Sequence, residues 1–190
     1  ITSAQMILFN SDSLNCLSVL EIQETMTKEE VLTAVRNLVK EQSALRSVYN
    51  AETQSVTEYS YNDNWEIPYI VKKDNPDIFR TLCLLEYSKT IFSTGKLQSF
   101  VAVVKRKRKH QVFIVVHHGL YDQYSGFVSR DRLKALLSGE EPGVYRYSDY
   151  VADAREHNKH NALAENVMEA YTYSLRKMTA EVRMSGMNEY

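Results

Sequence analysis

The chain has 190 residues, of which 44% are hydrophobic and 25% charged, and its formal net charge is −1. This length and composition suffice for one folded domain with a sizeable core and do not indicate disorder. A charge so close to zero favours neither nucleic acid nor an anionic membrane as a partner. The distant Cys16 and Cys83 predict no disulfide framework and suit a reducing cytoplasm. No apolar run approaches the roughly 18 residues of a membrane span, and no signal peptide is visible.

The first part of the chain predicts a strand, a helix and two further strands. Residues 17–22 form a short apolar stretch typical of a strand. Thr27 and Glu30 have the spacing of a capping box, and the apolar residues that follow recur on one helical face. Residues 56–61 and 65–71 are predicted to pair as strands around a turn rich in asparagine.

The second part predicts two helices, a hairpin and a helical tail. A helix is expected to begin at residues 75–77 and to continue to about Tyr87. The segments 100–104 and 111–116 read as a hairpin whose strands are apolar on both faces, as central strands covered by helices are. A helix over residues 125–137 should end before a glycine, followed by a long helix within residues 148–178. Together these elements predict an α+β fold in which a mixed sheet is flanked by helices.

The most informative segment is residues 115–125, with the sequence Val-Val-His-His-Gly-Leu-Tyr-Asp-Gln-Tyr-Ser. A strand delivers two imidazoles, His117 and His118, to a turn, and Asp122 lies four residues after the second of them. Imidazole is the side chain best suited to moving protons near neutral pH. The carboxylate could orient a histidine or brace the loop.

This segment resembles the HHxxxDG signature of the condensation domains of nonribosomal peptide synthetases, which belong to the chloramphenicol-acetyltransferase-like superfamily. Gln123 takes the place of the usual glycine, and with Ser125 the segment is more similar to the SHxxxDxxS variant of fungal synthetases. Four other segments are similar to the same family in the same order: residues 1–5, 30–49, with its Ala-Leu-Arg phrase in the family's first long helix, 95–104 and 147–150. The resemblance covers nearly the whole chain, but only the first half of a condensation domain.

The resemblance implies one chloramphenicol-acetyltransferase-like lobe over residues 1–190, with a long carboxyl-terminal helix. It marks His118 as the catalytic residue, which takes or positions the proton of an amine or hydroxyl attacking a carrier-bound acyl thioester. His117 is expected to pack or to orient the loop. Asp122 is expected to face the interior and to form a bidentate pair with Arg46, which would lock the turn. If that pair is buried, the loss of Asp122 would cost about 3–5 kcal/mol.

Gln123 and Ser125 are expected to lie in the substrate channel. A glutamine at this position could narrow the channel, donate a hydrogen bond, or mark a lobe that no longer catalyses. The basic run 105–110 is expected to be a solvated hairpin turn at the far end of the strand, although docking of an acidic carrier domain is an alternative. His157 and His160 have helical spacing but lack further ligands, so no metal site is expected.

The expected partners are carrier-protein domains, which would present phosphopantetheine, and the missing carboxyl-terminal lobe of the condensation domain; no cofactor is expected to bind directly. Three interpretations stay open. The chain is a synthetase lobe, a free-standing acyltransferase that completes its site by self-association, or a non-catalytic lobe that docks a carrier. The position of the histidine motif, well before the carboxyl end, favours the first over an antibiotic acetyltransferase.

Overall fold

The computed structural model describes most of the first three quarters of the chain: residues 8–9, 15–23, 25–84, 95–144, 146, 149 and 152. The chain divides into two compact units, residues 1–149 and 150–190, and the elements below belong to the first. Most of the predicted carboxyl-terminal helix falls outside the described residues, as do His157 and His160, and the single lobe over 1–190 stays a prediction. No helix in the described part of the chain has the length and apolar character needed to cross a membrane.

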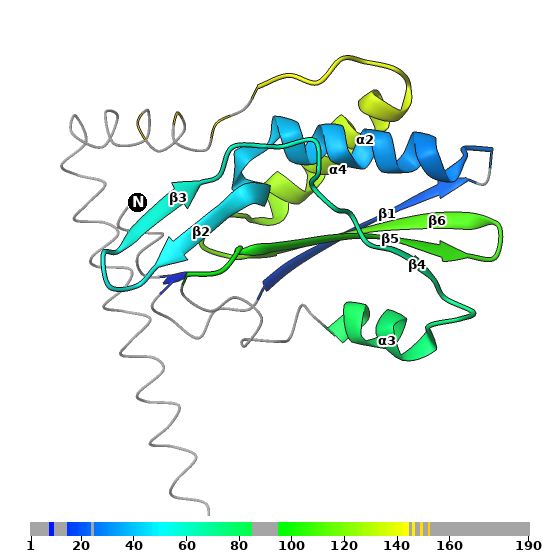
Figure 1. Ribbon diagram of the computed structural model, residues 1–190, viewed down its shortest axis with the longest axis horizontal. Coiled ribbons are helices and arrows are strands. Elements are labelled where there is room, and N and C mark those ends of the chain that lie inside the picture. Colours follow the sequence, from blue (N-terminus) through cyan, green and yellow to red (C-terminus); the bar gives the residue numbers. More distant parts are fainter. Residues whose placement is uncertain are drawn as a thin grey trace, which may run out of the picture. The chain divides into compact units, whose positions relative to one another are not determined.

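A four-stranded mixed sheet with the order β1-β6-β5-β4 forms the centre of the fold (Figure 1). Its strands are β1 (Asn15–Gln23), β4 (Tyr69–Val71), β5 (Ser99–Arg106) and β6 (Lys109–His117). Strand β6 is antiparallel to both β1 and β5, whereas β4 joins β5 in parallel. The predicted α+β fold with a mixed sheet is therefore confirmed.

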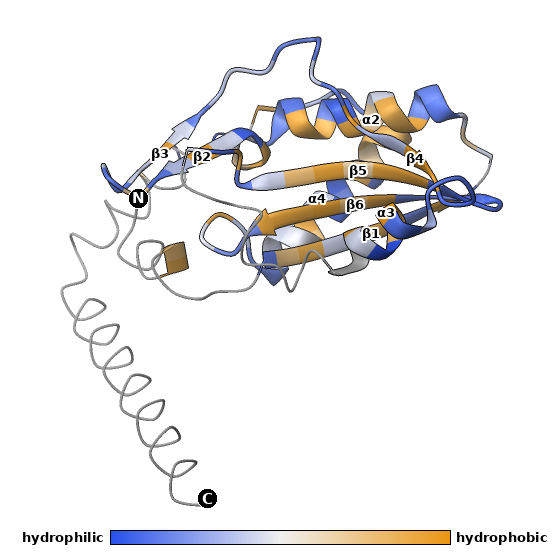
Figure 2. Ribbon diagram, turned by 60° about the horizontal axis from the view of Figure 1, so that its bottom comes forward, coloured by the Kyte–Doolittle hydropathy of each residue, from blue (hydrophilic) through white to orange (hydrophobic). Residues whose placement is uncertain are grey.

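The predicted hairpin of central strands is confirmed as β5 and β6. Side chains of β6 are buried from His110 through Val116, on both faces of the sheet. Figure 2 shows β1, β5 and β6 as mainly hydrophobic, with hydrophilic residues at the β5–β6 turn. This turn is shorter than predicted, because pairing extends to Arg106 and Lys109 and leaves only Lys107 and Arg108 between the strands.

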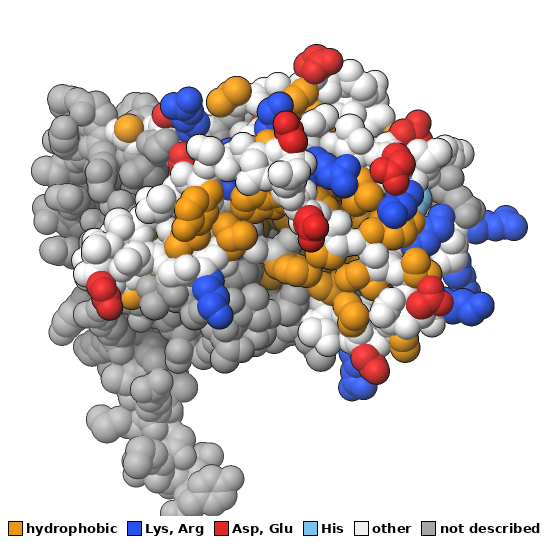
Figure 3. All heavy atoms as spheres, in the orientation of Figure 1, with side chains coloured by type: hydrophobic (Ala, Val, Ile, Leu, Met, Phe, Trp, Pro, Cys, Tyr) orange, Lys and Arg blue, Asp and Glu red, His pale blue; other side chains and the backbone are white. Residues whose placement is uncertain are grey.

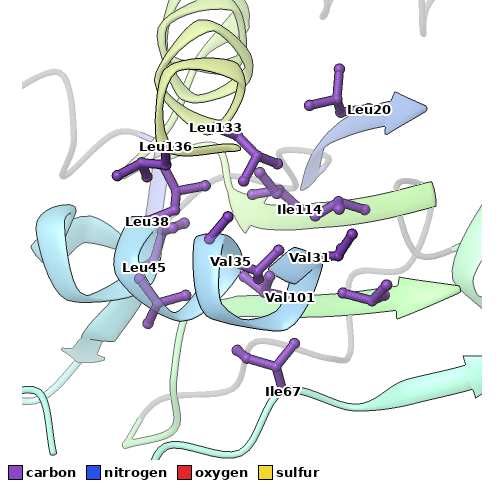
Figure 4. Close-up of a cluster of buried hydrophobic side chains, with 14 of the residues drawn as sticks. Leu20, Val31, Val35, Leu38, Leu45, Ile67, Val101, Ile114, Leu133 and Leu136 are labelled. Carbon is purple, nitrogen blue, oxygen red and sulfur yellow. The ribbon is translucent and has the colours of Figure 1, made fainter. Parts of the chain in front are cut away.

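Helices cover both faces of the sheet, because alternate residues of β5 and β6 are apolar on each side. On one face, α2 (Lys28–Glu41) and α4 (Gln123–Leu137) pack over Val101 and Ile114 in the larger core cluster (Figure 4). On the other face, α3 (Pro76–Leu84) contributes Leu82 to a second cluster with Ala102, Val104, Phe113 and Val115.

The capping box that begins α2 is formed by Thr27 and Glu30 as predicted. The helix ends at Glu41, however, and the Ala-Leu-Arg phrase expected at its end lies in the short 3-10 helix η1 (Ser43–Arg46). The predicted pairing of residues 56–61 with 65–71 is wrong. Strand β3 (Ser55–Glu58) instead pairs with β2 (Ser47–Asn50), because the turn at residues 51–54 folds it directly back, and β4 pairs with β5.

A buried ion pair joins α2 to α4. The carboxylate of Glu41, whose side chain is fully buried, accepts from Arg132 Nε at 2.8 Å and from Arg132 Nη2 at 2.9 Å. The backbone N–H of Gly143 donates to the same carboxylate at 2.9 Å, and Glu140 pairs with Arg132 at 3.0 Å. The last turn of α2, the middle of α4 and the segment after α4 are thus held by one network of charge-assisted bonds.

We expect Arg132→Met to lower the free energy of unfolding by about 3 kcal/mol, because it leaves the buried Glu41 carboxylate without its counter-ion. This is the lower end of the range for buried pairs, since the Arg132 side chain is 21% exposed. Chemical denaturation would measure the change. The matched control is Lys109→Met, which breaks an exposed pair with Glu21 and should leave the free energy of unfolding nearly unchanged, because water screens that pair. Equal losses in both variants would contradict a structural role for the buried pair.

Candidate active site

The two histidines of the motif lie where β6 ends and the connection to α4 begins. His117 is the last residue of β6, His118 begins a three-residue turn, and α4 starts at Gln123. The β5–β6 turn lies at the opposite end of β6, so the basic run is distant from the histidines, as predicted from the length of the strand. Arg106 through Lys109 are exposed, and Lys and Arg side chains gather at this end of the molecule (Figure 3).

Within the described part of the chain, the half-buried His118 has one hydrogen bond, which determines its tautomer. Its Nδ1 lies 2.9 Å from the backbone carbonyl oxygen of Tyr121. A carbonyl oxygen can only accept, so Nδ1 carries the proton, and in the neutral imidazole the lone pair is on Nε2. No side chain or backbone group in the described ranges bonds to Nε2. His118 can therefore take a proton at Nε2 without breaking the bond that orients its ring.

The carbonyl of Tyr121 is itself anchored to the sheet. The thiol of Cys16, on the adjacent strand β1, donates to the same oxygen at 3.1 Å. The ring of Tyr121 is buried in the larger core cluster and approaches Gly126 of α4, and this burial raises the pKa of its hydroxyl to about 12. The acceptor that orients His118 is consequently held by β1 on one side and by the core on the other.

His117 has the opposite tautomer. Its Nδ1 accepts the backbone N–H of Gly119 at 3.0 Å, which leaves the ring proton on Nε2 in the neutral form. The ring of Phe9 stacks on it at a centroid distance of 4.8 Å. Burial, and to a smaller extent the neighbouring His118, lower the pKa of His117 below its ordinary value. His117 is therefore built to stay neutral, packed under an aromatic ring.

Asp122 caps a helix instead of pairing with an arginine. It is exposed, and its Oδ1 accepts both the backbone N–H and the hydroxyl of Ser125 at 2.7 Å, at the N-terminus of α4. Partial burial of its carboxyl group opposes ionisation, although the residue as a whole is exposed, but the bonds from Ser125 and the nearby His118 outweigh this effect and lower the pKa of Asp122. The expectation that Asp122 faces the interior is wrong, because the free N–H groups of α4 are its nearest donors.

The predicted pair between Arg46 and Asp122 is not formed. The guanidinium of Arg46 donates to the backbone carbonyls of Val39, Lys40 and Tyr59. Burial lowers the pKa of the Arg46 guanidinium, and the carboxylate of Glu58 opposes that change. Carbonyls in the last turn of a helix have no partners within the helix, so a buried guanidinium placed just after α2 binds them first. Arg46 thus joins the end of α2 to the chain beyond β3.

The two residues expected to line a channel lie in the first turn of α4. Gln123 is the first residue of the helix and is exposed, and Ser125 uses both its N–H and its hydroxyl on Asp122. Their roles toward a substrate stay predictions. Among the described residues, no group of three or more His, Cys, Asp and Glu side chains is arranged to hold a metal ion.

Four contributors to the site were missed from the sequence: Phe9, Cys16, Gly119 and the backbone of Tyr121. Gly119 is the residue for which the sequence held a usable signal, since a glycine directly after two histidines at a strand end suggests a close approach of another group. Phe9 and Cys16 reach the loop from distant parts of the chain, and a backbone carbonyl is available at every position. No local pattern identifies such contacts.

Comparisons with known proteins bear on the fold. No family model and no curated protein sequence matches the chain. Solved structures do match. VibH, a nonribosomal peptide synthetase condensation enzyme, is 16% identical with a TM-score of 0.66, and the match covers 83% of this chain and 40% of VibH. The starter condensation domain of the rhizomide synthetase RzmA is 16% identical with a TM-score of 0.59, covering 82% of this chain and 40% of that one.

A third structure concerns condensation-domain-mediated chain release from the enacyloxin polyketide synthase. It is 17% identical with a TM-score of 0.59, and the match covers 80% of this chain and 33% of that one. In all three cases the chain spans well under half the length of the solved structure. The chain therefore has the fold of part of a condensation domain, as its motif led us to expect.

The opposite tautomers of the two histidines can be tested directly. We expect nitrogen-15 NMR, at a pH at which both imidazoles are uncharged, to place the proton of His118 on Nδ1 and that of His117 on Nε2. The reason is that Nδ1 of His118 faces a carbonyl oxygen, whereas Nδ1 of His117 faces an N–H. Assignment would use His118→Gln and His117→Gln. The same tautomer on both rings would contradict the hydrogen bonding described here.

Asp122→Ala should lower the free energy of unfolding by about 1 kcal/mol, the usual cost of losing a helix N-cap, with most of the loss recovered in Asp122→Ser. Chemical denaturation would measure both. Thr27→Ala removes the equivalent cap of α2, away from the histidines, and should cost a similar amount. A loss of 3–5 kcal/mol for Asp122→Ala would instead indicate a buried ion pair.

Proposed function

We propose that the chain is the histidine-bearing lobe of a condensation domain and that His118 is its catalytic residue. In the complete protein, His118 would take or position the proton of an amine or hydroxyl that attacks an acyl thioester presented by a carrier protein. The observation that carries this proposal is the Nδ1 bond from His118 to the Tyr121 carbonyl, which leaves the lone pair of Nε2 available for a proton. The fold, shared with solved condensation domains, supports the same function.

The proposed reaction balances without a metal or an oxidant. The nitrogen of the amine attacks the thioester carbonyl carbon and forms the new C–N bond, while Nε2 of His118 accepts the proton that this nitrogen loses. The C–S bond then breaks, and the departing sulfur takes the proton back from His118. With a hydroxyl as acceptor, the same sequence forms an ester. Phosphopantetheine enters as the arm that bears the thioester.

Two ionisable residues of the same loop, His117 and Asp122, lie near His118. The adjacent His117 is kept neutral by burial, so it adds no positive charge beside an imidazolium at His118. Asp122, whose pKa is lowered, supplies a negative charge in the same loop. An imidazolium formed at His118 during the reaction would thus have a carboxylate in the same loop and no second cation beside it.

The proposed partners are carrier-protein domains and a second lobe that completes the site, since the solved structures with this fold are more than twice as long as the matched part. Completion by self-association and a docking lobe without chemistry are the two alternatives. Measuring the molecular mass of the chain in solution at decreasing concentration distinguishes self-association from a single lobe. A persistent oligomer with acyl-transfer activity would favour a free-standing enzyme.

The central prediction concerns His118→Ala. The protein would be offered an aminoacyl-pantetheine thioester and an amine, and the product would be quantified by mass spectrometry. We expect His118→Ala to lower the rate by about 10²–10⁴-fold, the usual contribution of a general base. The control is Lys109→Met, an exposed residue at the far end of β6, which should leave the rate unchanged.

The assay should be run on the 190-residue chain and again with the remainder of a condensation domain supplied. Product only in the second case supports a lobe that needs its partner, whereas product from the chain alone supports self-association. Equal rates for the wild type and His118→Ala would refute the catalytic role of His118. Absence of product from both preparations would favour the docking lobe.

A further inference from the structure

An aromatic ring from the start of the chain lies on the histidine turn. Phe9 is stacked on Tyr49 of β2, with a centroid distance of 3.9 Å and an interplanar angle of 7°. Its other neighbour is His117, at 4.8 Å and 14°. The three rings are thus nearly parallel, and the ring of Phe9 packs against both an aromatic side chain of the second sheet and the imidazole at the end of β6.

The same ring occupies the space next to Gly119. A Cβ atom at position 119 would lie 2.9 Å from two ring carbons of Phe9 and 3.0 Å from a third. Such distances are too short for real contacts, so any side chain at this position requires Phe9 to move. Gly119 is therefore needed where it stands because of Phe9, and the pair forms a close contact between distant parts of the chain.

These contacts converge on one hydrogen bond. Phe9 packs on the imidazole of His117, whose Nδ1 is the acceptor, and on Gly119, whose N–H is the donor. The residue between donor and acceptor is His118. Whatever holds His117 and Gly119 in this arrangement also holds the backbone from which the side chain of His118 projects.

We infer that Phe9 is a positioning residue of the site: its ring clamps the turn formed by His117 and Gly119 and so sets the position from which His118 acts. This inference rests on the proposed function of His118. A ring that is only core filling would contribute to stability but would leave the two imidazoles unchanged. Displacement of a reacting group by about 1 Å can cost on the order of 10²-fold in rate, so a positioning role has a measurable effect.

The test uses Phe9→Ala, Gly119→Ala and the double variant in the 190-residue chain, with the remainder of a condensation domain supplied for the rate measurements. For Phe9→Ala we expect a mixture of tautomers at His117 by nitrogen-15 NMR, because the ring that covers the bond to Gly119 is gone. With that cover removed, the pKa of His117 should rise toward its ordinary value. The acyl-transfer kcat should fall by about 10- to 100-fold, with the KM for the thioester nearly unchanged.

Gly119→Ala should produce the same changes, because its methyl group displaces Phe9. The double variant should be no worse than either single variant, since the clash disappears with the ring, and this non-additivity is the signature of a direct contact. The control is Phe79→Ala, which removes an aromatic ring packed edge-on against Phe113, on the face of the sheet covered by α3. It should lower the melting temperature without altering either histidine.

The two readouts separate the possible failures. Unchanged NMR signals of His117 and His118 in Phe9→Ala would overturn the inference, even if the variant were less stable. Altered signals, together with no acyl transfer by the wild type even when the remainder of a condensation domain is supplied, would support the contact of Phe9 with the turn while refuting the proposed reaction. Should Phe9→Ala fail to fold, Phe9→Leu keeps most of the apolar volume but not the flat stacking surface, and the same NMR comparison decides.

Discussion

The requirement to bury both faces of β6 organises the whole structure. Its side chains alternate between the core under α2 and α4 and the smaller core under α3, so helices must lie on both sides of the sheet. With β5 and β1 on its two edges, β6 is held along its full length. The end of such a strand is held in place by its neighbours, and His117 is its last residue, with His118 directly after it. A site on a rigid element keeps its geometry better than one on a free loop.

The charged side chains inside the fold hold the ends of helices and join one helix to another. Arg132 meets the buried Glu41 and joins α4 to α2, while Arg46 binds the carbonyls at the end of α2. The sequence led us to expect a guanidinium–carboxylate pair bracing the histidine turn, and a bidentate pair of that chemistry is present, but between other residues. A carboxylate beside a helix N-terminus has free N–H groups as close partners, and Asp122 uses them.

The histidine turn shows how one local geometry gives two adjacent imidazoles different properties. His117 accepts a backbone N–H and lies under Phe9, whereas His118 donates to a carbonyl and keeps its second nitrogen available. Backbone groups therefore assign the tautomers, and burial keeps the first ring neutral.

The sequence by itself determined the features that depend on residues close together in the chain. These include the capping box at Thr27, the hairpin of β5 and β6, the end of α4 and the histidine motif at the end of a strand. Each rests on periodicity or spacing within a few residues.

Tertiary structure decided the pairings between distant segments: β4 with β5, Arg132 with Glu41, Cys16 with the Tyr121 carbonyl and Phe9 with Gly119. A side chain binds the nearest suitable partner in space, and a strand pairs with the nearest free strand edge. The sequence offers several carboxylates, carbonyls and strands that are chemically equivalent partners. Only the packing of the elements determines which of these partners lies within bonding distance. For this reason Arg46 and Asp122 do not pair: Arg46 binds backbone carbonyls and Asp122 binds Ser125.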